Sequence, residues 1–375
     1  MSRDKLLKLS DAANEAFYGG KFEKALTLSN EAIQLHPTNF ILYSNRSAVF
    51  LRLRRFRESL ADAKQSLALN SKWAKGFLRK GDALRGIGKF DEAILAYCQS
   101  LAIENETETV NSLKDTLYYS SIKDHLSVLL NEIGSDMNGE KLDAFLIISI
   151  IGQEYLAIDH MAEAIKLLQL ALDMNEANVA ALELKLSVLG AISFAYYQQK
   201  NYQQAIKFLD IQLEISEQVG ELEKQLTIYN TIVRMALLND ETMLAINYLR
   251  KQIQLMHSNN MEANDLRLNL ADLYIQLGNY ENAAQIITSI APLTFRNILE
   301  IVKLALAKGD TEVALTYCNR LAMISNTTDE KVLATLLKCK CLLLRKQAIP
   351  TLKILQNAMT HFINDHTATE IVCFC

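Results

Sequence analysis

The sequence contains few of the residues that interrupt helices. Only three prolines and thirteen glycines occur in 375 residues. Proline lacks a backbone donor and clashes with the preceding helical turn, so long proline-free stretches permit continuous helices. Half of the residues are hydrophobic, which provides ample material for a core. The composition therefore favours an all-α protein.

Features of secreted and membrane proteins are also missing. Residues 1–5 are mostly polar, and no apolar segment with a small-residue cleavage site follows them, so no signal peptide is indicated. The longest mostly apolar run, residues 145–151, is far shorter than the ~20 residues that span a bilayer. The six cysteines form no CxxC pair and no disulfide framework. We therefore expect a cytoplasmic protein with reduced thiols and no membrane partner.

Motifs for catalysis, cofactors and metals are absent as well. The six histidines include no HExxH motif and have no metal-ligand spacing. The segment Gly86-Ile87-Gly88-Lys89 lacks the full phosphate-loop pattern and is typical of a turn between helices. No paired carboxylates or nucleophile motif stand out. We therefore expect a protein that is not an enzyme and that binds no cofactor and no metal.

The charge is unevenly distributed along the chain. Residues 1–105 hold 17 basic and 11 acidic side chains, whereas the remainder carries a net charge of −10. A basic surface attracts acidic partners. Nucleic acid is not expected among them, because no zinc-finger, RNP or basic-zipper pattern is present. The cluster Arg52, Arg54, Arg55 and Arg57 is either a solvated loop or a rim that steers acidic partners.

Residues of similar size recur at a fixed spacing near the N-terminus. Three series have members 34 positions apart: Ala13, Ser47 and Gly81; Ala25, Ser59 and Ala93; and the pairs Lys21-Phe22, Arg55-Phe56 and Lys89-Phe90. A period of 34 is that of the tetratricopeptide repeat, in which two antiparallel helices and their turns form one unit. The sequence therefore resembles the tetratricopeptide-repeat family.

Within each repeat the two small residues lie 12 positions apart, one on each predicted helix. A bulky side chain at the crossing would hold the backbones apart, so small residues predict close packing of the two helices. The same spacing returns later in the chain, at Gly152 with Ala164, Ser193 with Ala205, Val233 with Ala245, Ala271 with Ala283, and Val302 with Ala314. We expect an all-α solenoid, a right-handed superhelix of antiparallel helix pairs in two segments.

The repeat pattern also suggests where the segments end. The register stops after residue 105, and residues 134–139 are rich in turn-forming residues. We expect a three-repeat clamp-like domain over 1–105 and a helical linker with a flexible loop over 106–143. A second array with longer repeats should cover 144–340. A capping helix and tail should cover 341–375, because an end unit has no neighbour to cover its outer face.

Three segments of the first domain resemble the clamp domains of Hsp90 and Hsp70 co-chaperones of the Hop and CHIP kind. They are residues 12–16 (AANEA), 42–47 (LYSNRS) and 73–80 (WAKGFLRK). In that family, side chains on the first helices of successive repeats bind the C-terminal carboxylates of an EEVD tail. The resemblance implies that the corresponding residues are Asn14, Asn45, Lys75 and Arg79, whereas Ser10 replaces a lysine of the family.

The residue types at these positions suit a carboxylate. Lys75 and Arg79 are four residues apart and share one face of a helix. Two cations and two amide donors can satisfy both oxygens of a carboxylate, and a hydrogen bond to a charged group contributes roughly 1.5–3 kcal/mol. Two alternatives remain: the groove binds other acidic peptides, or Lys75 and Arg79 are an ordinary solvated face.

A further resemblance extends beyond the clamp. Residues 148–156 (ISIIGQEYL) follow the predicted linker, and longer repeats begin near Leu186. This order resembles the N-terminal part of a very large animal tetratricopeptide scaffold that is linked to the mitotic midzone and cytokinesis. The long repeats also resemble those of spindle-orientation adaptors of the LGN type. A mitotic or cytoskeletal scaffold is therefore the alternative function, and the second partner, at residues 144–340, is not identified.

Overall fold

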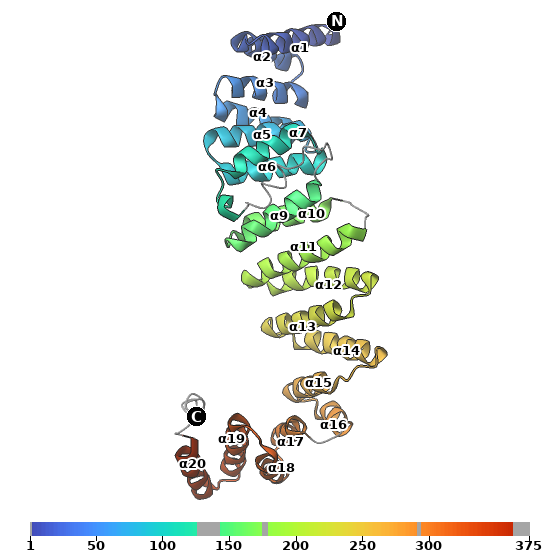
Figure 1. Cartoon of the computed structure of the whole chain (residues 1–375), viewed down its shortest axis with the longest axis vertical. Helices are drawn as coiled ribbons and strands as arrows, with labels where there is room; N and C mark the ends of the chain where they lie inside the picture. Colours follow the sequence, from blue (N-terminus) through green and yellow to red (C-terminus); the bar gives the residue numbers. More distant parts are fainter. Residues whose placement is uncertain (1, 126–142, 175–178, 291–293, 363–375) are drawn as a thin grey trace. The chain divides into compact units, whose positions relative to one another are not determined.

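The computed structural model describes residues 2–125, 143–174, 179–290 and 294–362 (Figure 1). All regular elements in these residues are helices. They divide into two compact units, Met1–Leu222 and Glu223–Cys375. The prediction of an all-helical array of paired antiparallel helices is confirmed. The predicted superhelical hand stays a prediction, as does the fourfold division of the chain.

The first unit runs from α1 to α12. Its helices are α1 (Ser2–Tyr18), α2 (Phe22–Leu35), α3 (Phe40–Arg52), α4 (Phe56–Leu69), α5 (Ala74–Ile87), α6 (Phe90–Ile103), α7 (Thr107–Leu117), the short 3-10 helix η1 (Lys123–His125), α9 (Ala144–Ala157), α10 (Met161–Asp173), α11 (Val179–Gln198) and α12 (Tyr202–Val219). Consecutive helices pack as pairs, such as α1 with α2 and α3 with α4. The aromatic residues Phe22, Phe56 and Phe90 begin the second helices of the first three pairs, as their 34-residue spacing predicts.

The second unit continues with α13 to α20. Its helices are α13 (Leu222–Leu238), α14 (Thr242–Ser258), α15 (Asn264–Gln276), α16 (Tyr280–Thr288), α17 (Phe295–Ala307), α18 (Thr311–Ile324), α19 (Thr328–Leu344) and α20 (Ala348–Phe362). Pairs form between α15 and α16, α17 and α18, and α19 and α20. The predicted boundary at residue 340 falls inside α19. None of the described helices is long and apolar enough to cross a membrane.

Small residues lie where the paired helices approach each other. Ala25 and Ala93 have no exposed surface. At the α3–α4 crossing the hydroxyls of Ser47 and Ser59 are 2.8 Å apart. Each hydroxyl also donates to the backbone carbonyl of the other residue, at 2.9 and 3.0 Å. Such contacts are possible only because no larger side chain separates the two backbones.

The α5–α6 crossing shows the same constraint in a different form. A Cβ atom added to Gly81 would lie 2.5 Å from a ring carbon of Tyr97, so the aromatic ring occupies the space that a side chain would need. The register is less regular in the second unit. Val233 is half-buried, whereas its neighbours Ile232 and Ala236 are buried and contribute to the core.

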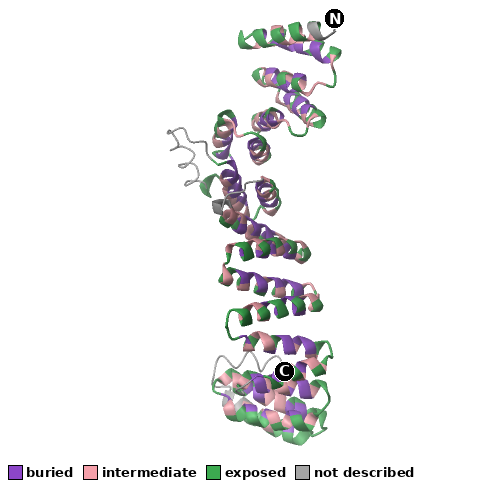
Figure 2. Cartoon of the chain, turned by 90° about the vertical axis from the view of Figure 1, so that its right-hand side faces the viewer, coloured by how far each residue is buried: buried purple, intermediate pink, exposed green. Residues whose placement is uncertain are grey.

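The hydrophobic core of the first unit passes through the predicted linker. Leu113 and Leu117 of α7 are fully buried in the same cluster as residues of α6, α9 and α10. Figure 2 shows buried residues along successive helices rather than in one central layer. The described part of the linker is therefore packed against the third repeat, and α6 of that repeat also contacts α9 and α10 directly. The loop predicted at residues 134–139 lies outside the described residues.

Asp91 connects three segments that lie far apart in the sequence. It is in the first turn of α6, and its Oδ1 accepts hydrogen bonds from the hydroxyl of Ser121 at 3.0 Å and from that of Tyr155 at 2.7 Å. Tyr155 belongs to α9 and is fully buried. Burial and the bond to Asp91 raise the pKa of Tyr155. The phenol therefore stays protonated and holds α9 against the end of the third repeat.

We predict that Ala25→Leu and Ala93→Leu will each destabilise the protein by roughly 1–3 kcal/mol, because overpacking forces the paired helices apart. The control is Ala61→Leu, which places the same side chain at an exposed position of α4. Thermal unfolding followed by circular dichroism measures the effect. If both crossing variants had the same melting temperature as the control, the small residues would not determine the spacing between the paired helices.

We also predict that Tyr155→Phe will lower the free energy of unfolding by about 1–3 kcal/mol, because it removes a buried donor from a carboxylate. Tyr18→Phe serves as the control, since the Tyr18 side chain is 87% exposed. Urea unfolding compares the two variants. Equal midpoints for them would mean that the Asp91 connection adds nothing to the packing of α9.

Candidate functional site

The structure places the five predicted binding residues on the first helices of three repeats. Ser10 and Asn14 lie on α1, Asn45 lies on α3, and Lys75 and Arg79 lie on α5. The side chains of Asn14, Asn45 and Lys75 are exposed, and those of Ser10 and Arg79 are half-buried. Lys75 and Arg79 are one helical turn apart, as their spacing predicts.

A groove of about 670 Å³ crosses the same helices. Its walls come mainly from α1, α3, α5 and α7, and include Phe17, Arg52, Arg79 and Glu108. Of the five predicted residues, only Arg79 lines this groove. The predicted binding role of all five residues, Ser10, Asn14, Asn45, Lys75 and Arg79, stays a prediction.

All four of the other predicted residues share helix faces with the groove, and Ser10 precedes Phe17 by seven positions. Residues three, four and seven positions apart lie on one side of a helix. Asn14 precedes Phe17 by three positions, Asn45 precedes Arg52 by seven, and Lys75 precedes Arg79 by four. These side chains therefore continue the faces that form the groove, one or two turns towards the start of each helix.

Two of the three cations that line the groove, Arg79 and Arg85, have acidic neighbours within the protein, whereas Arg52 lies over the ring of Phe17. Arg79 Nη1 lies 3.1 Å from Asp82 Oδ2 and 3.4 Å from Glu108 Oε1. Arg85 is 3.9 Å from Asp82 and 3.8 Å from Asp115. Glu108 is 60% exposed, so its attraction to Arg79 is screened by water. An incoming carboxylate can therefore replace Glu108 at a small energetic cost.

Asp82 is held more firmly than Glu108. Its Oδ1 accepts a hydrogen bond of 3.0 Å from the hydroxyl of Tyr97, which is fully buried. Burial and the nearby Asp82 charge raise the pKa of Tyr97, so the phenol remains a donor. Asp82 thereby orients Arg79 from within α5, whereas Glu108 contacts it from α7.

Lys75 differs from Arg79 in its surroundings. Among the residues that the structure describes, Lys75 takes part in no ion pair. Its ammonium group is therefore available to a ligand without the displacement of a protein carboxylate. The exposed cation beside the partly paired guanidinium is the strongest anion-binding feature of α5.

Arg46 has a structural role although it lies next to Asn45. Its guanidinium binds Asp62 in a bidentate pair of 2.6 and 2.7 Å and donates to Asn30 Oδ1 at 2.8 Å. The hydrogen bond to Asp62 raises the pKa of Arg46. This cation ties α3 to α2 and α4, and it does not add to the charge that a ligand meets.

The sequence did not identify two features of the groove, namely the Glu108 side chain and α7 as its fourth wall. A signal for α7 was present, because α3, α5 and α7 begin at Phe40, Ala74 and Thr107, which are 34 and 33 residues apart and nearly continue the repeat period. Of the arginine cluster, Arg52 lines the groove, and Arg55 pairs instead with Glu58 at 2.9 Å. Within the described residues no group of His, Cys, Asp or Glu side chains is arranged to hold a metal ion.

Comparisons with known proteins identify the repeats. Family models described as tetratricopeptide repeat match residues 45–108 and 265–288. Human tetratricopeptide repeat protein 28 is 29% identical over 224 residues, which are 59% of this chain and 9% of that protein. The Hsp70-Hsp90 organizing protein of wheat (Triticum aestivum) is 42% identical over 95 residues, 25% of this chain and 16% of that protein. The chain thus spans less than a fifth of the length of either relative.

Solved structures with similar repeats include two of different length. The crystal structure of yeast Tom70 covers 96% of this chain and 92% of its own, with 13% identity and a TM-score of 0.32. The first TPR of Spaghetti (RPAP3), bound to the HSP90 peptide SRMEEVD, covers 30% of this chain and 90% of its own. Its identity is 30% and its TM-score is 0.29.

Proposed function

The chain is a tetratricopeptide-repeat protein, and we propose that it is a non-catalytic scaffold whose N-terminal groove binds an acidic peptide with a free C-terminal carboxylate. The observation that carries this proposal is the placement of Lys75 and Arg79 one turn apart on α5, with Arg79 in the groove wall. Asn14 and Asn45 supply amide donors from the two preceding first helices. The partner is a protein in the cytoplasm, and no nucleic acid or membrane is involved.

The finer form of the proposal names the C-terminal EEVD tail of Hsp90 or Hsp70. Its support is the wheat relative, whose name links it to both chaperones and whose matched segment of 95 residues is similar in length to the three-repeat domain. Four of the five positions of the clamp pattern hold the expected residue types, Asn14, Asn45, Lys75 and Arg79. The net positive charge of residues 1–105 favours the same kind of peptide.

Ser10, which stands where the co-chaperone clamps have a lysine, lowers the affinity that we expect for the peptide. A serine hydroxyl there has no charge with which to replace the lysine of the co-chaperone clamps. Loss of one charge-assisted contact of about 1.4 kcal/mol weakens binding tenfold. We therefore expect a dissociation constant in the range of tens of micromolar, an order-of-magnitude figure for a clamp that is short of one cation.

A mitotic or cytoskeletal scaffold remains the second candidate. The observation that favours it is the match of 224 residues to human tetratricopeptide repeat protein 28, which extends well beyond the three clamp-like repeats. A pull-down from cell lysate, with Lys75→Ala combined with Arg79→Ala as the comparison, separates the two functions. Chaperones lost from the double variant support the first, and cytoskeletal proteins retained by both forms support the second.

We predict that an EEVD peptide will bind more tightly than its C-terminally amidated form, and that Arg79→Ala will weaken binding about tenfold. Calorimetric titration measures both effects, and binding should also weaken at high salt, because the contacts are partly exposed. Arg57→Ala is the matched control, since Arg57 is an exposed arginine of α4 outside the groove lining. Equal affinity for the two peptide forms would contradict recognition of the carboxylate. Equal effects of Arg79→Ala and Arg57→Ala would contradict binding in the groove.

We also predict that Glu108→Gln will strengthen binding of the same peptide about two- to fivefold, because Arg79 no longer has a competing carboxylate within the protein. Glu104→Gln is the control, since it removes an equal charge from an exposed position outside the groove lining. Titrations at one ionic strength compare the two variants. A gain of the same size in both would reflect net charge alone, and no gain in either would contradict the competition.

A further inference from the structure

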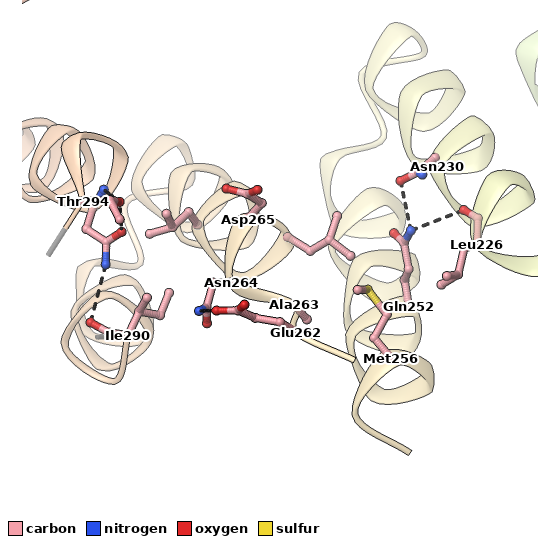
Figure 3. A pocket seen from close by; sticks show the side chains of 13 residues that line it. Leu226, Asn230, Gln252, Met256, Glu262, Ala263, Asn264, Asp265, Ile290 and Thr294 are labelled. Atoms are coloured by element: carbon pink, nitrogen blue, oxygen red, sulfur yellow. Dashed lines mark hydrogen bonds between the residues drawn. The ribbon is translucent and has the colours of Figure 1, made fainter. Parts of the chain in front are cut away.

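The second unit contains a cavity of about 500 Å³ that the N-terminal groove does not share. Figure 3 shows it among α13, α14, α15 and the start of α17. Leu226, Met256, Leu268 and Ile290 give it an apolar surface, and Glu262 and Asp265 place two carboxylates in its wall. No lysine, arginine or histidine is among its lining residues.

Most of the polar side-chain donors in this wall are engaged by other protein groups, the amide nitrogen of Asn230 excepted. The amide of Gln252 donates to Leu226 O at 3.3 Å and to Asn230 Oδ1 at 2.9 Å. Asn264 donates to Glu262, and the amide of Asn297 donates to Ile290 O at 3.4 Å. The hydroxyl of Thr294 donates to Asn297 Oδ1 at 2.6 Å. These residues therefore offer a ligand few hydrogen-bond donors.

One acceptor in the wall is left without a partner. Gln252 is 2% exposed, and its Oε1 accepts no hydrogen bond from the described residues. The orientation of the amide is fixed, because a backbone carbonyl can only face the nitrogen. In Figure 3 the side-chain oxygen points away from α13, towards α15 and the cavity. A buried acceptor without a donor is unfavourable, and a ligand N–H that bonds to it would remove that cost.

We propose that this cavity binds an arginine side chain of a partner protein. The guanidinium carries five N–H donors and a permanent charge, which match an unpaired amide oxygen and two carboxylates. The apolar residues Leu226, Leu268 and Ile290 suit the aliphatic stem that precedes the charged head. Met256, one turn after Gln252 on α14, is unbranched and can change rotamer to admit the head group.

One contact within the protein competes with this ligand. Arg296 of α17 lies 2.8 Å from Asp265 Oδ1. Their side chains are 44% and 79% exposed, so the pair is screened by water and is weak. Arg296 does not line the cavity, and Asp265 keeps its second oxygen for the ligand. The remaining carboxylate, Glu262, accepts only from the neutral amide of Asn264 among the described contacts.

The proposed site is independent of the N-terminal clamp. Every residue of its lining belongs to the second unit, and its chemistry is the reverse of that of the first groove. The clamp offers cations and amide donors to a carboxylate, whereas this cavity offers acceptors to a cation. The proposed site thus indicates the chemical character of a partner for the second array. The sequence alone identifies no partner for this part of the chain.

Methyl NMR of the full chain tests the proposal. The protein is labelled at its methionine and isoleucine methyl groups, and the probe is the peptide Ac-Ala-Ala-Arg-Ala-Ala-NH2. We expect the probe to shift the methyl signals of Met256 and Ile290 in a saturable manner. The same peptide with citrulline, which keeps the shape of arginine without its charge, should cause much smaller shifts.

Variants of the wall complete the test. Combined Glu262→Gln and Asp265→Asn should weaken binding of the arginine peptide about three- to tenfold. The control combines Glu281→Gln with Asp329→Asn, which neutralises two exposed carboxylates of the same unit outside the cavity. Gln252→Met, which removes the unpaired acceptor at similar volume, should also weaken binding, and its melting temperature is measured alongside. If Gln252→Met does not fold, the carboxylate variants still decide.

Four outcomes would overturn the proposal. Three of them are the absence of methyl shifts with the arginine peptide, equal shifts with the citrulline peptide, and equal losses in the wall and control variants. The fourth is methyl shifts in the first unit alone. None of these results bears on binding of an EEVD peptide at the N-terminal groove, so the two proposals fail separately.

Discussion

The close approach of the two helices in each repeat is the constraint on which the rest of this molecule depends. Where Ser47 meets Ser59, each hydroxyl reaches the backbone of the opposite helix. Where Gly81 meets α6, the Tyr97 ring fills the place of a side chain. These contacts set the distance between the two helices of each repeat. They therefore also determine which faces of the first helices remain uncovered. The uncovered faces that form the groove are therefore a consequence of the packing within each pair.

The same packing explains why the repeats extend past the point where their sequence pattern fades. Each pair leaves an apolar face that the next element must cover. Here α7 covers the third repeat through Leu113 and Leu117, and the bond from Tyr155 to Asp91 then holds α9. The core can continue where the 34-residue register stops, because any amphipathic helix of suitable length can cover the exposed apolar face of the preceding pair.

Fold and site were predictable from the sequence to different degrees. The helix pairs were predictable because Ala25, Ser59 and Ala93 obey a local rule, in which small residues mark close backbones. The placement of Lys75 and Arg79 on the first helix of the third repeat followed from the same register, whereas their choice as binding residues came from the resemblance to co-chaperone clamps. The contact of Arg79 with Glu108 was not predictable, because it joins side chains 29 residues apart through rotamers that no spacing determines. The unpaired oxygen of Gln252 was hidden for a similar reason, since its amide is oriented by the Leu226 carbonyl.

Repeats with one backbone plan can present opposite chemistry because the packing positions and the ligand-facing positions are separate. The crossings require small residues and tolerate few others, whereas the uncovered faces accept either sign of charge. In the first unit the exposed Lys75 and the half-paired Arg79 favour an anion. In the second unit Glu262, Asp265 and the unpaired Gln252 oxygen favour a cation. Under the two proposals above, the protein would distinguish its partners by charge, since a ligand that suits one surface is repelled or left without hydrogen bonds at the other.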